Sequence, residues 1–330
     1  MMKRTAMFIF LFFMFAGALF SSIASGAEKS EEQIKKEENQ TRMNLYKKTA
    51  ATTLIPWYYL AAIDQFERQV HEDFPEDRVT AIQPESVFWN GLDNPNQSDR
   101  QSPLITKMFN GWGDDGNGDG IADKNNDEDV LYSIASYLSS FGHNPDDIKI
   151  ALWQYYHRDL SVQTIMNNAR VFKHFGTIHL TDRNFPVPLH ANYSYRSTWG
   201  DARGFGGRRI HEGTDIFANY GVPVQSTTYG VIEMKGWNKY GGWRIGIRDI
   251  FNIYHYYAHL NGFEDGVNVG DVVKPGDVIG SVGATGYGPP GTSGKFPPHL
   301  HYGMYKDNGY SEWSFDPYPY LKKWERMSRD

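Results

Sequence analysis

The residues best suited to chemistry lie in the apolar stretch Phe296-Pro-Pro-His-Leu-His-Tyr-Gly303, which holds two histidines two residues apart. Side chains alternate between the two faces of a β-strand, so His299 and His301 are expected to point the same way, with Leu300 in the opposite layer. Two imidazole groups on one face predict a reactive site or a metal site.

A second polar motif, Arg209-Ile-His-Glu-Gly-Thr-Asp-Ile-Phe217, places His211 four residues before Asp215. Neutral imidazole and carboxylate are both good zinc ligands, and two of them from one loop need only a third protein ligand to make an open site. His301 is the natural candidate for that ligand. Each motif alone is a weak signal, but a further histidine in Tyr257-Ala-His-Leu260 between them makes the combination much more specific.

Two neighbouring polar residues are expected to stay outside this site. In regular strand alternation His255, Tyr257 and His259 share one face, but His255 would lie about 13 Å from His259. We therefore predict that His255 is a rim or structural residue. Glu212 is followed by Gly213 and lacks the second histidine of a His-Glu-x-x-His helix, so an outward-facing glutamate is favoured over a general base.

The segment from about Arg209 to Tyr305 resembles the LytM and lysostaphin type of zinc metallopeptidase, the M23 family. The segments that carry the resemblance are His211-Glu-Gly-Thr-Asp215, Gly221-Val-Pro-Val224, Tyr256-Tyr-Ala-His-Leu260, the glycine-rich turns at 270–280 and 283–286, and Pro298-His-Leu-His-Tyr302. Together they cover about a third of the chain. The resemblance implies a mainly antiparallel β fold, a single zinc ion and cleavage of peptide bonds in bacterial peptidoglycan.

The resemblance also implies a role for each polar residue. His211, Asp215 and His301 would hold zinc through three protein ligands, which leaves a fourth position for water or the scissile carbonyl. His259 and His299 would form the catalytic pair. One would take a proton from the water and the other would stabilise the oxyanion or protonate the leaving amine, and the two assignments are both open.

Residues 1–27 are typical of an export signal. Lys3 and Arg4 precede the apolar run Met7–Phe20, and Ser25-Gly26-Ala27 offers small residues for cleavage before Glu28. The alternative is an uncleaved membrane anchor, for which the apolar run is short. Membrane contact is expected only through this segment.

Composition limits the remaining possibilities. The chain has 330 residues, of which 40% are hydrophobic and none is cysteine, so its core must be stabilised by packing and bound metal without disulfides. Cleavage after Ala27 would remove Lys3 and Arg4 and no acidic residue, which moves the formal charge from -6 to -8. An acidic chain argues against a nucleic-acid partner.

The chain is expected to have an α+β fold with two domains. Residues 28–48 are polar and predict a linker or a helix start, and residues 49–178 predict a mainly α domain. The helices are expected at Thr53–Val70, Asp127–Phe141, Asn144–Tyr156 and Ser161–Phe175. Residues 179–330 predict a mainly antiparallel β domain from strand-like runs between glycine and proline turns. These runs are Gly230–Met234, Trp243–Ile247, Asn252–Ala258, Asp277–Val282 and His299–Tyr305.

The helical region loosely resembles the lysozyme-like lytic transglycosylases. Ile55–Ile63 followed by Glu67 is similar to their catalytic-acid helix, and Glu128–Tyr156 is similar to their later helices. Arg68 stands where that family usually has serine, and no Gly-Leu-Met-Gln-like segment follows. Glycan cleavage needs a carboxyl group kept protonated in a partly apolar site. We interpret Glu67 as an ordinary exposed helix residue and the domain as a degenerate binding or positioning module.

The segment Asp115-Gly-Asn-Gly-Asp-Gly-Ile-Ala-Asp123 matches the front of a calcium-binding loop. Asp115, Asn117, Asp119 and Asp123 supply oxygen side chains at the first, third, fifth and ninth positions, with glycine at the sixth. Asn126 stands at the twelfth position in place of the bidentate glutamate. The loop therefore predicts either a calcium site or a solvated turn rich in aspartate and glycine.

These patterns together predict a secreted or wall-associated zinc metallo-endopeptidase whose partner is the peptidoglycan stem peptide. The export signal, the helical region and the C-terminal domain together resemble the sporulation cell-wall endopeptidases of endospore-forming bacteria, which implies cleavage of the L-Ala-D-Glu bond. Two alternatives are a non-catalytic wall-binding or scaffold protein and a glycan-cleaving lytic transglycosylase that acts through Glu67. Tyr254, Tyr256 and Tyr287 could stack on substrate or fill the core. The oligomeric state is left open.

Overall fold

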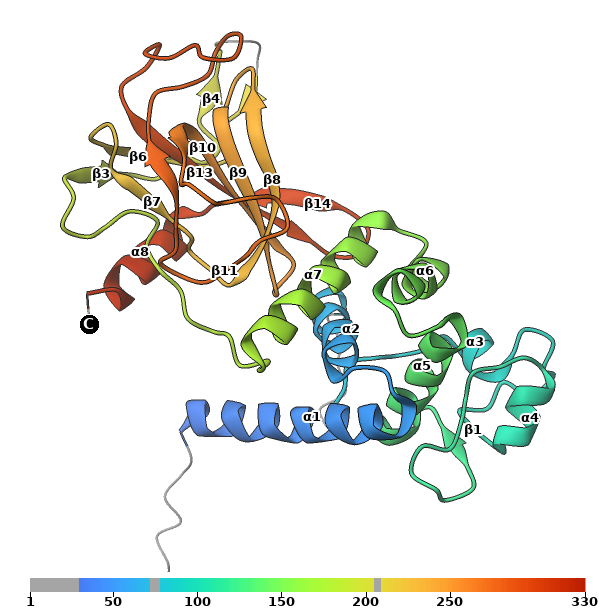
Figure 1. Ribbon diagram of the computed structural model, residues 1–330. Coiled ribbons are helices and arrows are strands. Elements are labelled where there is room, and N and C mark those ends of the chain that lie inside the picture. The colour runs from blue at the N-terminus through green and yellow to red at the C-terminus, as the bar shows by residue number, and fades with distance from the viewer. Residues whose placement is uncertain (1–29, 72–77, 205–208, 330) are drawn as a thin grey trace, which may run out of the picture. The chain divides into compact units, whose positions relative to one another are not determined.

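The structure is a computed structural model that describes residues 30–71, 78–204 and 209–329 (Figure 1). The export signal predicted at residues 1–27 lies outside these ranges. The described chain consists of a helical region followed by a strand-rich region, which confirms the α+β fold class. None of its described helices combines the length and the apolar character needed to cross a membrane.

Seven helices of the described chain precede the main sheet. They are α1 (Glu31–Thr53), α2 (Trp57–Val70), α3 (Ser86–Asn90), α4 (Pro103–Met108), α5 (Asp127–Phe141), α6 (Pro145–Tyr156) and α7 (Asp159–Phe175). Helices α2, α5, α6 and α7 lie where apolar periodicity predicts them, whereas α1 occupies most of the polar segment 28–48. Helix α1 ends at Thr53, where Leu54 takes the left-handed conformation at φ 63°, and Pro56 then stands at the N-cap of α2, where its missing N–H removes no helical hydrogen bond.

The strand-rich region forms one ten-stranded antiparallel sheet. Its strands are β3 (Tyr193–Tyr195), β6 (Thr214–Ala218), β7 (Pro223–Gln225), β8 (Gly230–Asn238), β9 (Gly242–Asp249), β10 (Ile253–Phe263), β11 (Val272–Val273), β12 (Val278–Val282), β13 (His299–Asp307) and β14 (Glu312–Phe315). The main path runs β11-β8-β9-β10-β13-β6-β3, while β12 joins β10 to β7 and β14 pairs with β13. Two short ribbons, β1 (Arg100–Gln101) with β2 (Ala122–Asp123) and β4 (Ala202–Arg203) with β5 (Arg209–Ile210), stand apart from it.

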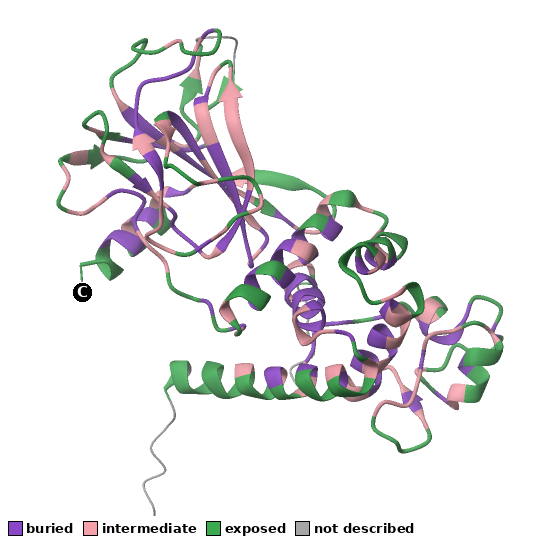
Figure 2. Cartoon of the chain, viewed as in Figure 1, coloured by how far each residue is buried: buried purple, intermediate pink, exposed green. Residues whose placement is uncertain are grey.

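One face of the sheet is apolar and buried. Ile247, Tyr257 and Leu300 from this face share a core with Ile279 of β12. The C-terminal helix α8 (Tyr318–Met327) adds Leu321 and Trp324 to the same core. Figure 2 shows the buried residues concentrated along these strands and on α2 and α7. The opposite face of β10 and β13 is thereby left to carry polar side chains.

The helical region packs directly against the sheet. Val231 and Ile250 belong to the same hydrophobic cluster as the inward faces of α2 and α7. Polar contacts accompany this packing, since the Arg158 guanidinium donates to both carboxylate oxygens of Asp307 at 2.6 and 2.9 Å. Helices and strands are therefore joined by a common core as well as by the chain.

Candidate metal centre

Three neighbouring strands bring the polar motifs together on one face of the sheet. In the antiparallel register His301 of β13 lies opposite Asp215 of β6 on one side and Ala258 of β10 on the other. Directly opposed residues in an antiparallel pair point to the same face. His299 lies two residues before His301 and lines the same pocket, as strand alternation predicts.

The side chains of His211, Asp215 and His301 converge on one point. His211 Nε2 lies 2.8 Å from His301 Nδ1, and both nitrogens lie 3.0 Å from Asp215 Oδ1. Among the residues that the structure describes, this is the one group of three or more metal-ligating side chains so closely placed. Gly213 makes the approach possible, because a Cβ atom there would lie only 2.6 Å from the His301 ring.

The surroundings of this cluster suit a bound cation. His211 Nδ1–H donates to the Thr198 carbonyl oxygen at 2.7 Å, which fixes the ring and leaves Nε2 for the cluster. Burial alone would raise the pKa of the Asp215 carboxyl, but hydrogen bonds from His211 and His301 outweigh it and hold that pKa well below its ordinary value. Two imidazoles and one carboxylate are the three-ligand set of an open zinc site, so the residues present fit zinc.

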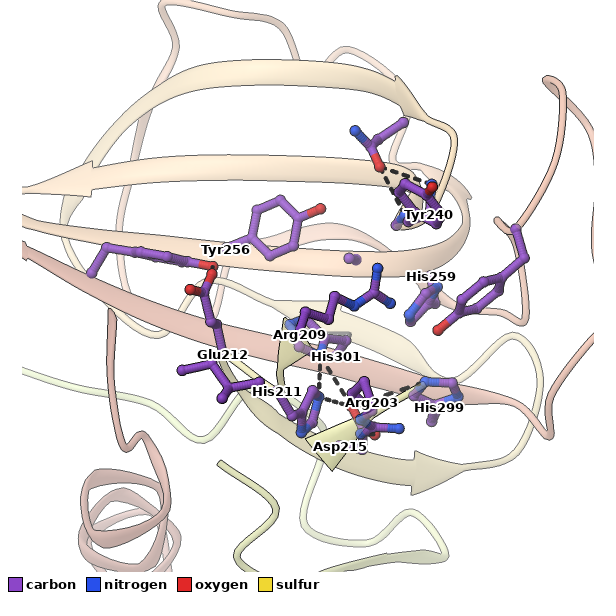
Figure 3. A pocket seen from close by; sticks show the side chains of 16 residues that line it. Arg203, Arg209, His211, Glu212, Asp215, Tyr240, Tyr256, His259, His299 and His301 are labelled. Carbon is purple, nitrogen blue, oxygen red and sulfur yellow. Dashed lines mark hydrogen bonds and ion pairs between the residues drawn. The ribbon is translucent and has the colours of Figure 1, made fainter. Parts of the chain in front are cut away.

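His259 and His299 lie beside the cluster with one ring nitrogen each left over. Their Nδ1–H groups donate to the carbonyl oxygens of Thr285 and Pro297, both at 2.7 Å. His259 Nε2 has no hydrogen-bond partner among the described residues, and His299 Nε2 lies 4.0 Å from Asp215 Oδ1, beyond hydrogen-bond distance (Figure 3). The ring centroids lie 4.7 Å apart, and burial together with His299 and His301 lowers the pKa of His259 to about 3. The Nδ1–H bonds fix the tautomer of both rings, so the lone pair of each neutral ring is at Nε2.

The position of His259 corrects one prediction. Regular alternation places it on the face of His255 and Tyr257, but those two residues are buried in the core while His259 lines the pocket. The cause is a register shift in β10 after Tyr257, with His259 in the left-handed region at φ 61° and its N–H bonded to the Gly241 carbonyl at 2.7 Å. Such a bulge re-aims a side chain across the sheet.

The cluster opens into a pocket of about 210 Å³. Figure 3 shows Asp215 and His301 on its floor and Tyr240, Tyr256 and His259 around it. Tyr287 also lines it, as expected for a substrate-facing aromatic residue, whereas Tyr254 lines an adjoining pocket with Tyr256.

Sequence reasoning missed two arginines of this pocket, Arg203 and Arg209. Arg203 donates to Asp215 Oδ2 at 2.6 Å and so holds the carboxylate from outside the cluster. The signal for Arg209 was present, because it stands two residues before His211, and residues two apart in an extended segment share a face.

Two polar residues behave as the sequence predicts. His255 is structural, since it is fully buried, with Nδ1 2.6 Å from the Tyr302 hydroxyl and Nε2 3.1 Å from Asp249 Oδ2. Glu212 is exposed at the pocket rim and accepts a hydrogen bond from the Tyr305 hydroxyl at 3.2 Å. Neither side chain belongs to the convergent cluster.

Glu67 is not the exposed residue that the helical pattern predicts. It is only 4% exposed in the core-facing surface of α2. Its carboxylate accepts a short hydrogen bond from the Tyr156 hydroxyl and lies 2.7 Å from His71 Nε2. This carboxylate is held within the helical region and does not line the pocket.

The calcium-like loop satisfies its own oxygen atoms. Asp115 accepts backbone N–H groups from residues 118, 119 and 120 of its own loop, and Asp129 accepts those of residues 116, 117 and 123. Asn126, at the twelfth position, caps helix α5. Asp115, Asp119 and Asp123 are not among the close groups of acidic and histidine ligands in the described residues, and the calcium site stays a prediction.

Comparison with known proteins identifies the family. The sequence profile of Peptidase family M23 matches residues 209–314. Over 311 residues the chain is 58% identical to the L-Ala--D-Glu endopeptidase of Bacillus subtilis (strain 168), which covers 93% of this chain and 94% of that protein. The chain belongs to peptidase family M23.

Other relatives match a smaller part of the chain. The chain is 37% identical to lysostaphin of Staphylococcus staphylolyticus over 115 residues, which are 34% of this chain and 22% of that protein. The solved catalytic domain of lysostaphin from Staphylococcus simulans matches at 35% identity and a TM-score of 0.32, over 40% of this chain and 93% of the domain. Membership of family M23, shown by the profile match and by the B. subtilis relative, makes the chain a peptidase, and its His/Asp/His cluster is of the metal-binding type.

Proposed function

We propose that the protein is a zinc endopeptidase that hydrolyses the L-Ala-D-Glu bond in the stem peptide of bacterial peptidoglycan. The observation that carries this proposal is the convergence of His211, Asp215 and His301 in one pocket, beside two further histidines with unused Nε2 atoms. The B. subtilis relative, matched over nearly its whole length, carries that bond in its name. A scaffold that had lost zinc would have no need to keep this set.

The residues would divide the work as follows. His211 Nε2, Asp215 Oδ1 and His301 Nδ1 would hold the metal. Bound zinc supplies polarisation of the scissile carbonyl and lowers the pKa of a water molecule toward ~7. His259 or His299 accepts the proton of the attacking water at Nε2, and the other stabilises the oxyanion or protonates the leaving amine.

The proposal extends to the place and setting of the reaction. Peptidoglycan lies outside the cytoplasmic membrane, so the segment 1–27 serves as an export signal and the mature protein acts at the wall. A role in wall remodelling during sporulation belongs to the same proposal. So does the division into a linker at 28–48, a helical domain at 49–178 and a metallopeptidase domain at 179–330.

The test is mass spectrometry of the fragments that residues 28–330 release from purified peptidoglycan. We expect peptides that begin at D-Glu, loss of release with a chelator, and recovery with added zinc. New reducing ends or anhydro-sugars would move the function to glycan cleavage, and no release at all would make the protein a binder. Release at another peptide bond would keep the zinc mechanism and reject the bond.

A further inference from the structure

Arg209 places a positive charge over the metal centre of an acidic protein. It lies in the short ribbon β5, two residues before His211, and lines the same pocket as the metal cluster. Figure 3 shows its side chain extending toward the middle of that pocket. The whole chain has a formal charge of -6, so the cation lies in a protein that is acidic overall.

No carboxylate among the described residues forms an ion pair with Arg209. Its cross-strand partner in the ribbon is Arg203, and like charges directly opposite each other are unfavourable. Arg203 is compensated, because it is paired with Asp215 at 2.6 Å. Within the described ranges no carboxylate oxygen comes within ion-pair distance of Arg209. It has instead an aromatic support, with its guanidinium carbon 5.0 Å from the ring centre of Tyr240.

That aromatic support is built into the site. Tyr240 lies in the turn between β8 and β9, where the Asn238 side-chain oxygen accepts the N–H groups of Tyr240 and Gly241 at 2.9 and 3.0 Å. The Gly241 carbonyl in turn accepts the N–H of His259. The same turn therefore fixes the backbone of His259 and the platform under Arg209. A guanidinium held on such a platform presents a planar fork that matches a carboxylate.

The proposed substrate supplies a carboxylate at the required place. The leaving nitrogen of the L-Ala-D-Glu bond is the amine of D-Glu, and the stem peptide continues from D-Glu through its γ-carboxyl group. The α-carboxylate therefore stays free, on the same carbon atom as the leaving nitrogen. A peptide bound with its scissile carbonyl at the metal cluster carries this anion within the same pocket.

We propose that Arg209 binds the free α-carboxylate of D-Glu and so selects the residue on the leaving side of the scissile bond. This inference rests on the proposed function and names the residue that reads its substrate. It explains why a pocket that already uses Arg203 to neutralise Asp215 holds a second guanidinium. Charge-assisted hydrogen bonds to a carboxylate are roughly twice as strong as neutral ones, which suits a selective contact.

The test uses two muramoyl tripeptides that differ only in the second residue, D-Glu in one and D-isoglutamine in the other. Amidation removes the negative charge of the α-carboxylate and changes the size and shape of the group little. The zinc-loaded wild-type enzyme is expected to prefer the D-Glu peptide in kcat/KM. Arg209→Gln should lower kcat/KM by about tenfold to a hundredfold on D-Glu and change it much less on D-isoglutamine. Arg209→Lys keeps the charge but loses the planar guanidinium. Its kcat/KM on the D-Glu peptide should lie between those of the wild type and Arg209→Gln.

Lys239→Gln is the matched control, because the Lys239 ammonium also lies over the Tyr240 ring, at 5.6 Å, but does not line the pocket. It should leave the preference unchanged. A second readout is equilibrium binding of both peptides to the chelator-treated protein, where Arg209→Gln should remove the difference between them.

Equal losses on both peptides would overturn the assignment and make Arg209 a structural residue of the ribbon. No preference in the wild type would overturn it as well. A wild-type enzyme that cuts a different bond would reject the proposed function and this inference with it. Cleavage of L-Ala-D-Glu without a carboxylate preference would reject the inference alone.

Discussion

The metal centre and Glu67 are both buried and ionisable, but they differ in their hydrogen bonding. Glu67 bonds to groups inside the fold, whereas the histidines beside the metal cluster have ring nitrogens that face a pocket. Glu67 is held by the Tyr156 hydroxyl and His71, both from the helical region itself. His259 and His299 each spend Nδ1–H on a backbone carbonyl and keep Nε2 directed into a pocket. Burial is common to both groups, so burial does not identify the reactive one.

This difference indicates that hydrogen-bond donors and acceptors without a protein partner, placed at a pocket, mark the catalytic site. A carboxylate whose hydrogen bonds are made inside the fold contributes stability, because removing it leaves buried partners unpaired. Imidazole rings that are oriented by one nitrogen and open at the other are arranged for proton transfer. The two regions should therefore respond oppositely to mutation, one in activity and the other in stability.

The largest effect is expected at the metal ligands. His301→Ala removes one of three ligands and should abolish zinc binding and peptide release, a loss beyond the 10²–10⁴-fold that one general acid or base contributes. Zinc content by atomic absorption and fragment release from peptidoglycan are the measurements. His190→Ala, at an exposed histidine, is the control. Wild-type release of amino groups by His301→Ala would show that the zinc mechanism is wrong.

Substitutions in the catalytic pair should lower the rate of catalysis without lowering the zinc content of the protein. His299→Ala and His259→Asn are each expected to lower kcat by about 10²–10⁴-fold while zinc stays bound. Asparagine is chosen at residue 259 because it tolerates the left-handed backbone conformation found there. Rate constants are compared at equal zinc occupancy. Loss of zinc from either variant would make that histidine a ligand and contradict the division of roles.

A smaller effect is expected from the support of Asp215. Arg203→Gln removes the guanidinium that holds Oδ2, and should weaken zinc binding or activity by about 10–100-fold. Competition with a chromogenic chelator measures the affinity. Arg196→Gln is the matched control, because Arg196 forms an exposed pair with Asp201 at 3.5 Å. An unchanged zinc affinity in Arg203→Gln would mean that Asp215 does not depend on Arg203 for its orientation.

Most of the framework of this site was predictable from local pattern. Period-two alternation placed His299 and His301 on one face, and apolar periodicity located α2, α5, α6 and α7. Both patterns depend on residues close in sequence. The convergence of His211 with His301, which are 90 residues apart, was predicted from the ligand types of the two motifs, and the family resemblance implied the same set.

The errors occurred where tertiary contacts decide. The bulge at His259 depends on a hydrogen bond from its N–H to Gly241 in the preceding β-hairpin turn, which no alternation rule contains. Glu67 is buried because Tyr156, far along the chain, folds over it. The Asp115 loop has side chains of the right type for a cation and also backbone N–H groups that bond to its carboxylate oxygens, so residue type alone does not decide between a calcium site and a solvated turn. The type of a residue limits the roles it can have, and tertiary packing determines which of those roles it takes.

The smallest effect on activity, and the sharpest contrast with the metal cluster, is expected at Glu67. Glu67→Gln should leave peptide release within about twofold of wild type and lower the free energy of unfolding by about 1–2 kcal/mol, through lost hydrogen bonds to a charged group. Urea unfolding measures the stability, and Glu85→Gln at an exposed position is the control. Loss of peptide release in a folded Glu67→Gln protein would show that Glu67 takes part in peptide cleavage together with the metal centre.

The pH dependence of that stability difference follows from His71. The hydrogen bond to Glu67 raises the pKa of His71 above 6.5. A group whose pKa is raised on folding contributes stability that is fully present below its unfolded pKa and is lost as pH rises through the folded pKa. The gap between wild type and Glu67→Gln should thus be larger at pH 5.5 than at pH 8.5. His71→Gln should flatten this difference, and a gap that widened at alkaline pH would show that His71 does not pair with Glu67 in solution.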